Sequence, residues 1–138
     1  MTTFKLSIRT PSRVLYAGEV TEVIVPSHDG EIGIRSGHED FIGLLGTGVV
    51  KVVNGGNDYW YTISQGVYHI ESNQVKVLAQ AGENADEVNV DAEAKRKAEL
   101  EPIVQKMSSF DEDYQSTAAQ YALAKARIEA HRRTSLVN

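Results

Sequence analysis

The distribution of glycine and alanine divides this chain near residue 84. All eleven glycines lie at or before Gly82, and ten of the thirteen alanines lie at or after Ala85. The first part is rich in β-branched and aromatic residues, whereas the second is rich in alanine, glutamate, lysine, arginine and glutamine, which favour helices. We therefore expect an α+β protein, with a β domain over residues 1–84 and a linker with helices over residues 85–138.

Short strands separated by turns account for the first part. Period-two alternation or short apolar runs predict seven or eight strands, with candidates at residues 4–9, 14–16, 20–25, 31–35, 49–53, 59–63, 66–70 and 75–78. Residues 54–57, Asn-Gly-Gly-Asn, are a strong hairpin signal. No helical period interrupts the strands, which argues against a parallel βαβ sheet and favours an antiparallel β-sandwich or barrel.

Two helices are predicted in the second part, over residues 92–107 and 114–132. Asp91 is placed to be the N-cap of the first helix. Pro102 lacks a backbone N–H and clashes with the preceding turn, so we expect a kink there, or a helix that ends near Leu100 and restarts.

Small apolar residues on both helices predict an antiparallel helical hairpin. They are Ala118, Ala122, Ala126 and Ala130 on the second helix, and Ala94, Ala98, Leu100, Val104 and Met107 on the first. Alanine buries much less apolar area than leucine, so a contact built on it is weak. A weak contact suits a segment that moves.

Charge is distributed unevenly over the two helices. Residues 85–113 contain nine acidic and four basic side chains, whereas residues 114–138 contain four basic and one acidic. Attraction between the helices favours the folded hairpin, but the basic segment is also able to contact an acidic surface elsewhere. Arg127, Arg132 and Arg133 are the candidates for such a contact, because little acid surrounds them in the sequence.

Composition excludes several classes of function. The net charge of −5 argues against a general affinity for nucleic acid, and the lack of cysteine excludes disulfides and thiolate chemistry. No apolar run approaches the roughly 20 residues of a membrane helix, and the strand pattern that starts at Phe4 leaves no room for a targeting peptide. We expect a cytosolic chain that meets a membrane only through partners.

Two clusters have side chains suited to catalysis or metal binding. These are His28-Asp29 and His38-Glu39-Asp40, and neither has the spacing of a metal site, so we expect no metal. Residues 43–48 are glycine-rich but lack the Gly-Lys-Ser/Thr ending of a phosphate loop. We expect no catalysis and no cofactor. The alternatives are a free-standing adaptor protein and a small hydrolase that uses His28 or His38.

Three motifs in the first part resemble the epsilon subunit of bacterial F-type ATP synthase. Residues 25–38, VPSHDGEIGIRSGH, are similar to that family's P-x-x-x-G-x-x-G-I/V-x-x-G-H loop. Residues 45–52 follow its L-x-x-G-x-V-x-V pattern, and Ser-Gln-Gly-Val-Tyr stands at 64–68. Residues 93–99 and 122–126 resemble the family's two C-terminal helices, so the resemblance covers essentially the whole chain.

The resemblance implies a ten-stranded β-sandwich at the foot of a rotor and a regulatory helical hairpin. The sandwich would contact the gamma subunit and the membrane c-ring through Glu31, Arg35 and His38. The extended hairpin would carry Arg127, Arg132 and Arg133 to an acidic loop of the beta subunit and inhibit ATP hydrolysis. The chain would then be a non-catalytic subunit that couples proton-driven rotation to ATP synthesis, peripheral on the cytoplasmic face of the bacterial inner membrane.

Some members of that family bind ATP through an Ile/Leu-Asp-x-x-Arg-Ala motif at the start of the first helix. Here Asp91 matches the motif only in part, because Ala94 stands at the arginine position. Arg96 lies two residues further on, about 200° around the helix, and cannot simply substitute. We therefore expect no tight nucleotide binding.

Overall fold

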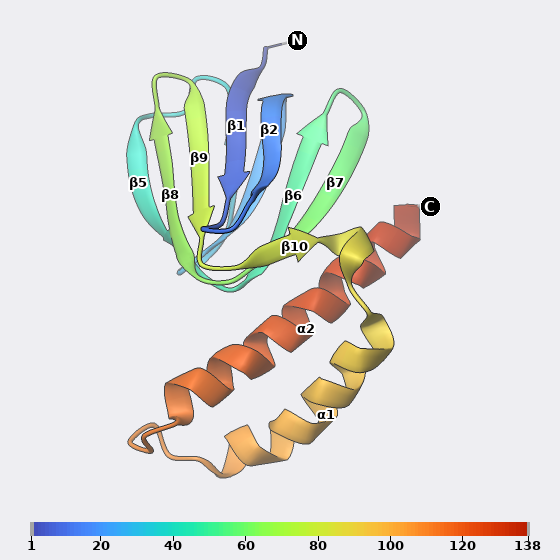
Figure 1. Cartoon of the computed structure of the whole chain (residues 1–138). Coiled ribbons are helices and arrows are strands. Elements are labelled where there is room, and N and C mark those ends of the chain that lie inside the picture. Colours follow the sequence, from blue (N-terminus) through green and yellow to red (C-terminus); the bar gives the residue numbers. More distant parts are fainter. Residues whose placement is uncertain (1, 138) are drawn as a thin grey trace.

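A folded β-sheet stands on a hairpin of two helices in the computed structural model of the chain (Figure 1). The structure describes the backbone of residues 2–137 and the side chains of residues 2–135. The strands are β1 (Phe4–Arg9), β2 (Val14–Val20), β3 (Glu22–Ser27), β4 (Gly30–Arg35), β5 (Phe41–Leu45), β6 (Gly48–Asn54), β7 (Asn57–Ile63), β8 (Gly66–Glu71), β9 (Gln74–Ala79) and β10 (Gly82–Asn84). A 3-10 turn, η1 (Ala85–Glu87), and the helices α1 (Val90–Lys106) and α2 (Tyr114–Val137) follow.

The strands form one continuous sheet that folds back on itself. Its order is β10-β7-β6-β3-β5-β8-β9-β1-β2, and β4 pairs with β3 beside this path. Neighbouring strands are antiparallel except β1 and β9, which are parallel. A parallel pair needs a long connection, and here the intervening strands supply it. The predicted β-sandwich with a C-terminal helical hairpin is confirmed, and one parallel ladder is added to it.

All eight segments predicted as strands are strands in the structure, and the sheet contains two more, β5 and β10. Periodicity does not predict β5 because its sequence, Phe-Ile-Gly-Leu-Leu, places apolar residues on both faces. Strand β10 has only three residues, Gly82–Asn84, which are too few for a periodic pattern, and it lies at the very end of the expected β domain. The ten strands agree with the number that the family resemblance implies.

The core of the sandwich comes from alternate residues of the strands. In β9, for example, Val75, Val77 and Ala79 are buried while Gln74, Lys76 and Leu78 face outward. Side chains that are less than 2% exposed include Tyr68, Ile8, Ile34, Ile63, Ile70, Val20, Val23, Val25, Val50, Val52 and Val77. Burying one such aliphatic side chain stabilises the fold by about 1.5–3 kcal/mol.

One glycine of the Ser64–Tyr68 motif has a clear steric role. Gly66 pairs with Ala79 on one side and Leu45 on the other, so its backbone lies between two strands. A Cβ atom at this position would overlap the backbone carbonyl of Leu78. Because a backbone cannot move aside as a flexible side chain can, the position requires glycine.

The connection between sandwich and helices is ordered by capping. The Asn84 side chain accepts a hydrogen bond from the Asp86 backbone, and the Glu87 carboxylate accepts one from the Asn84 backbone. Arg13 also pairs with Glu87 at 3.0 Å, and this hydrogen bond lowers the pKa of the Glu87 carboxyl, with a further contribution from Asn84. Helix α1 then begins with Asn89 as its N-cap, whereas the sequence pointed to Asp91.

Helix α2 lies between the lower end of the sandwich and helix α1 (Figure 1). Helix α1 does not end near Leu100 but continues to Lys106 with Pro102 inside it. Pro102 is on the exposed side of the helix and within its last turns. Water can therefore satisfy the carbonyl that loses its intrahelical partner, which lowers the cost of the proline.

The alanines pack differently from the prediction. Ala130 packs with Val49, Trp60 and Ala85, and Ala122 and Ala126 line a groove between α2 and the sandwich. The α2 alanines therefore mainly face the sheet instead of α1.

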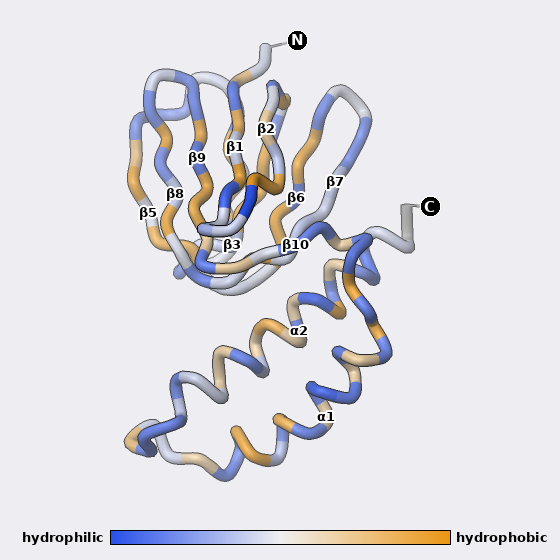
Figure 2. The backbone as a smooth tube through the Cα atoms, viewed as in Figure 1, coloured by the Kyte–Doolittle hydropathy of each residue, from blue (hydrophilic) through white to orange (hydrophobic). Residues whose placement is uncertain are grey.

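On α1, Ala94 and Ala98 are exposed, so their predicted place in the helix–helix contact is wrong. The side of α1 with reduced exposure carries Glu93, Lys97, Leu100, Glu101 and Val104, at helical spacing. In Figure 2, short hydrophobic and hydrophilic stretches alternate along both helices.

Candidate functional site

The three residues proposed to contact the rotor lie on and beside strand β4. Glu31 and Arg35 are exposed, and His38 is exposed in the loop that follows. Four residues along a strand span roughly 13 Å, so Glu31 and Arg35 lie at opposite ends of β4. Arg35 pairs with Glu22 at 3.1 Å, whereas Glu31 is 3.8 Å from Arg133 on α2. The structure thus groups Arg35 with His38 and places Glu31 at the helix-facing end.

The loop that carries His38 is held by the turn between β8 and β9. The Asn73 side-chain oxygen accepts hydrogen bonds from the Ser36 hydroxyl at 3.1 Å and the Gly37 backbone at 3.0 Å, and its amide donates to the Thr3 carbonyl. The backbone of Ser72 donates to Asp40 at 3.2 Å. Gly37 has a φ of 84°, a left-handed conformation that favours glycine. The loop is therefore fixed at both ends before any partner binds.

Four exposed apolar side chains form a continuous patch on strands β5, β8 and β9, which we call the apolar patch. They are Ile42, Leu44, Val67 and Leu78, with exposed fractions of 68, 61, 36 and 43%. Leu44 is paired with Val67, and Val67 with Leu78, so three of them form one row across the strands. Exposed apolar groups gathered in this way mark an interaction surface.

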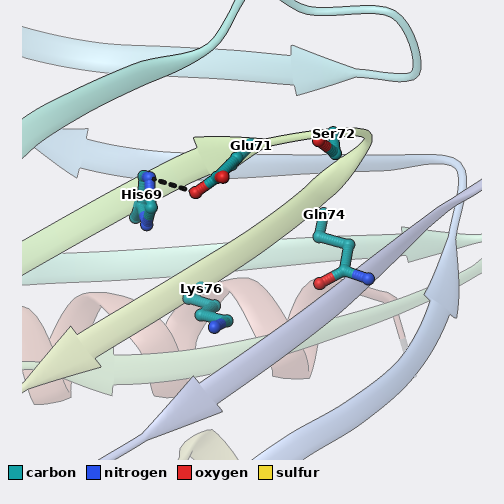
Figure 3. Close-up of a pocket in the computed structure, with 5 residues that line it drawn as sticks. All are labelled: His69, Glu71, Ser72, Gln74 and Lys76. Atoms are coloured by element: carbon teal, nitrogen blue, oxygen red, sulfur yellow. Dashed lines mark ion pairs between the residues drawn. The ribbon is translucent and has the colours of Figure 1, made fainter.

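Polar residues border the apolar patch on one side. His69 is opposite Ile42 and Lys76 in the strand register. His69, Glu71, Gln74 and Lys76 line a shallow hollow of about 220 Å³, where the His69 ring is 3.1 Å from Glu71 (Figure 3). Apolar side chains bordered by polar ones are a composition typical of protein-binding surfaces.

Sequence analysis did not identify the apolar patch. The signal is the run Phe41-Ile42 and Leu44-Leu45, which gives β5 an apolar residue on each face. Figure 2 shows β5 as a largely hydrophobic strand, although it is at the outside of the molecule. Such a run can also be a fully buried strand, and only the tertiary structure distinguishes the two.

The three candidate arginines of α2 are all engaged in ion pairs. Arg127 donates to Glu83 of β10 and, at 3.1 Å, to Glu93 of α1. Arg132 and Arg133 both bind Glu129, at 2.6 and 3.0 Å. These two hydrogen bonds, that from Arg132 foremost, lower the pKa of Glu129 to about 2 despite some opposing desolvation. In the folded hairpin these cations are therefore already neutralised within the chain.

Residues at the start of α1 do not form the nucleotide motif seen in some family members. Asp91 is exposed in the first turn, and Ala94 and Arg96 are exposed as well. Glu93 is the residue of this turn that points inward, and it binds Arg127. A buried carboxylate would repel the phosphates of a nucleotide, so the residues at the start of α1 do not fit a bound nucleotide. The absence of tight nucleotide binding stays a prediction.

Neither histidine cluster forms a catalytic arrangement in the part of the chain that the structure describes. His28 and His38 are exposed, and no hydrogen bond joins either ring to a carboxylate. The Nδ1 atom of His38 is 2.8 Å from the Glu39 carbonyl, which only accepts, so Nδ1 carries the proton. Among the described residues there is also no group of three metal-ligating side chains. The small-hydrolase alternative thus finds no geometric support.

Comparisons with known proteins agree on one family. The family model for the ATP synthase Delta/Epsilon chain, beta-sandwich domain, matches residues 3–85. The ATP synthase epsilon chain of Desulforamulus reducens is 33% identical over 93% of this chain and 96% of its own length. That of Anaeromyxobacter sp. (strain K) is 32% identical over 89% of this chain and 93% of its own.

Solved structures are similar in fold. A chain in the mitochondrial ATP synthase of Euglena gracilis, in a structure of OSCP, F1 and c-ring, aligns with a TM-score of 0.79. It is 21% identical and matches 99% of this chain and 82% of its own length. A chain in the central stalk and c-ring structure of the Tetrahymena thermophila enzyme aligns with a TM-score of 0.56 at 14% identity.

Proposed function

The chain belongs to the ATP synthase epsilon family, and on that premise we propose that it is a non-catalytic rotor subunit of the central stalk. In this role it couples proton-driven rotation to ATP synthesis and inhibits ATP hydrolysis through its C-terminal helices. No described helix is long and apolar enough to cross a membrane. Attachment to the cytoplasmic face of the bacterial inner membrane would then come through the assembled complex.

The sandwich is the part proposed to dock on the rotor, and the apolar patch is the observation that carries this half. Leu44 and Ile42 are more than 60% exposed, and exposed apolar side chains gathered on one face are typical of a surface that a partner covers. We assign the patch and the nearby loop with Arg35 and His38 to the gamma subunit. Glu31, at the other end of β4, is assigned to the polar loops of the c-ring.

The hairpin is the part proposed to regulate. Its contact with the sandwich combines small alanine surfaces with ion pairs, so the docked and extended positions can lie within a few kcal/mol of each other. On extension, Arg127, Arg132 and Arg133 would leave their internal carboxylates and bind an acidic surface of the beta subunit. The folded hairpin permits hydrolysis in this scheme, and the extended hairpin inhibits it.

Binding to purified gamma subunit tests the docking assignment. Leu44→Asp places a charge in the centre of the apolar patch and should weaken binding by about tenfold or more, as expected for a central interface residue. Asn57→Asp adds the same charge at an exposed position at the start of β7 and should have no effect. Equal affinities for the two variants would remove the patch from the interface.

Hydrolysis by the reconstituted complex tests the regulatory assignment. Replacing Arg132 and Arg133 with alanine should raise ATP hydrolysis toward the level reached when residues 89–138 are deleted. Lys95→Ala removes an exposed cation from α1 and serves as the control. Unchanged hydrolysis in the double variant would rule these arginines out as the inhibitory contact.

Co-purification tests the alternative function. A chain that did not co-purify with alpha, beta and gamma subunits would instead be the free-standing adaptor.

A further inference from the structure

One residue of α2 joins all three parts of the molecule. Arg127 donates through Nε to Glu83 on the last strand and through Nη1 to Glu93 in the first turn of α1. The exposed fractions of the Arg127, Glu83 and Glu93 side chains are 21, 16 and 11%. Ion pairs this far from solvent are less screened than surface pairs, and charge-assisted hydrogen bonds are the stronger kind. We call these three residues the Arg127 cluster.

The Arg127 cluster is the stronger of two ionic connections between α2 and the sandwich. Among residues 2–135, the other such pair is Arg133–Glu31, at 3.8 Å and with Glu31 more than half exposed. Exposed pairs of this kind contribute little to stability. The apolar contact around Ala130 is also small, because alanine contributes only one methyl group. Retention of the folded hairpin therefore depends largely on Arg127.

Charge within the cluster makes release of the arginine costly. Two carboxylates share one guanidinium, and Oε2 of Glu93 is buried with no hydrogen-bond partner of its own. If Arg127 leaves, Glu83 and Glu93 lose their shared cation, and a buried carboxylate without a counter-ion is strongly disfavoured. The two glutamates thus draw Arg127 back into the folded arrangement.

We propose that Glu83 and Glu93 are internal competitors for Arg127, which hold the hairpin folded and withhold this guanidinium from the partner. The inference rests on the proposed function for the identity of the partner, but the closing of the hairpin is a property of the chain alone. Arg127 binds either the two glutamates or the partner's acidic surface. Removal of a glutamate and removal of the arginine should then have opposite effects on inhibition.

The isolated chain provides the first test. Because the chain has no cysteine, Ala126→Cys introduces a single thiol at a position that is 7% exposed in the groove between α2 and the sandwich. Its labelling rate reports how often the hairpin opens. Glu93→Gln and Glu83→Gln should each accelerate labelling about tenfold, the loss expected for one charge-assisted hydrogen bond. Glu99 is an exposed glutamate of α1, and the control variant Glu99→Gln should not accelerate labelling.

Global unfolding is monitored separately with Val50→Cys, a thiol in the fully buried core of the sandwich. Its labelling should stay slow in the glutamate variants, so that local opening and loss of the fold are distinguished. Labelling at position 126 that stays within twofold of the parent in both Glu83→Gln and Glu93→Gln would overturn the proposal.

The assembled complex provides the second test. Glu93→Gln should strengthen inhibition of ATP hydrolysis, whereas Arg127→Gln should weaken it although both variants open the hairpin. Opposite changes in inhibition are not expected if the cluster only stabilises the fold. If both variants changed inhibition in the same direction, the proposal that the glutamates compete with the partner for Arg127 would be overturned. If labelling accelerates but neither variant changes hydrolysis, the cluster still closes the hairpin and the proposed inhibitory function is wrong.

Discussion

Different forces stabilise the two parts of this protein: apolar burial stabilises the sandwich, whereas ion pairs contribute much of what holds the hairpin in its folded position. Fully buried aliphatic side chains from both halves of the folded sheet stabilise the sandwich, among them Ile34 and Ile63. The hairpin contributes few buried apolar groups, and its inward residues on α1 include Glu93, Lys97 and Glu101. The free energy gained by burying apolar side chains is large and does not depend on direction. The charged groups of an ion pair, in contrast, can form equivalent pairs with the charges of a partner. This difference in forces is what the proposed movement of the hairpin on a fixed sandwich requires.

Truncation of a core residue should affect stability most. Ile63→Ala leaves a cavity in the sandwich and should lower the free energy of unfolding by about 2–5 kcal/mol. Leu100→Ala, in the half-buried side of α1, should lower it by less than about 1 kcal/mol, because the hairpin opens before the sandwich unfolds. Urea titration followed by fluorescence measures both.

Ile103→Ala, on the exposed side of α1, is the matched control for Leu100. If Leu100→Ala proved as damaging as Ile63→Ala, the hairpin would be part of the same cooperative unit, and the contrast between the regions would be lost.

Removal of both helices should leave the sandwich folded. A chain that ends at Val88 keeps the cap formed by Asn84 and Glu87, and should still unfold cooperatively on heating. The one tryptophan, Trp60, packs against Ala130 and is 7% exposed, so its emission should shift to the red when α2 is absent. A truncated chain without cooperative unfolding would contradict the two-part architecture.

Loss of the Asn73 side chain should loosen the loop that carries His38 without unfolding the sandwich. Asn73→Gly tolerates the φ of 61° at this position and removes hydrogen bonds to Ser36, Gly37 and Thr3. The amide of Gly37 should then exchange about tenfold faster or more, as expected for loss of its hydrogen bond. Asn73→Asp retains an acceptor for Gly37 and should slow that exchange again. Equal exchange in all three proteins would mean that the loop is ordered by something else.

Acid should have the smallest effect, and at the end of α2 it acts through Glu129. Ion pairs with Arg132 and Arg133 lower the pKa of Glu129 from 4.5 to about 2. The stabilising contribution is present above pH 4.5 and is lost as the pH falls toward 2, because the folded state holds this carboxylate ionised. Arg132 is more than half exposed, so solvent screening keeps the effect slight.

Nuclear magnetic resonance titration of the α2 amides between these pH values measures this loosening. Glu129→Gln should remove the dependence at residues 129–133. A titration of Glu129 near its ordinary pKa would show that the two arginines do not hold it in solution.

Local patterns in the sequence were sufficient for most of the architecture. Period-two alternation and short apolar runs identified eight strands, and the change from glycine to alanine separated strands from helices, because these signals depend on neighbouring residues alone. The same reasoning failed for Ala94 and Ala98, which are exposed. Small residues fit many surroundings, so their spacing says that a close contact is possible but not which element makes it.

The candidate surfaces show the same division between what local sequence predicts and what the fold decides. The sequence by itself determined which side chains are available: the Glu31–His38 segment, the basic end of the chain and the family motifs. Only the tertiary structure decided their arrangement. It gathered Ile42, Leu44, Val67 and Leu78 from three strands into the apolar patch, and it placed Arg127 between Glu83 and Glu93. Contacts between residues far apart in the chain depend on which strands pair and where a helix packs. The periodicity of a local segment does not specify either of these.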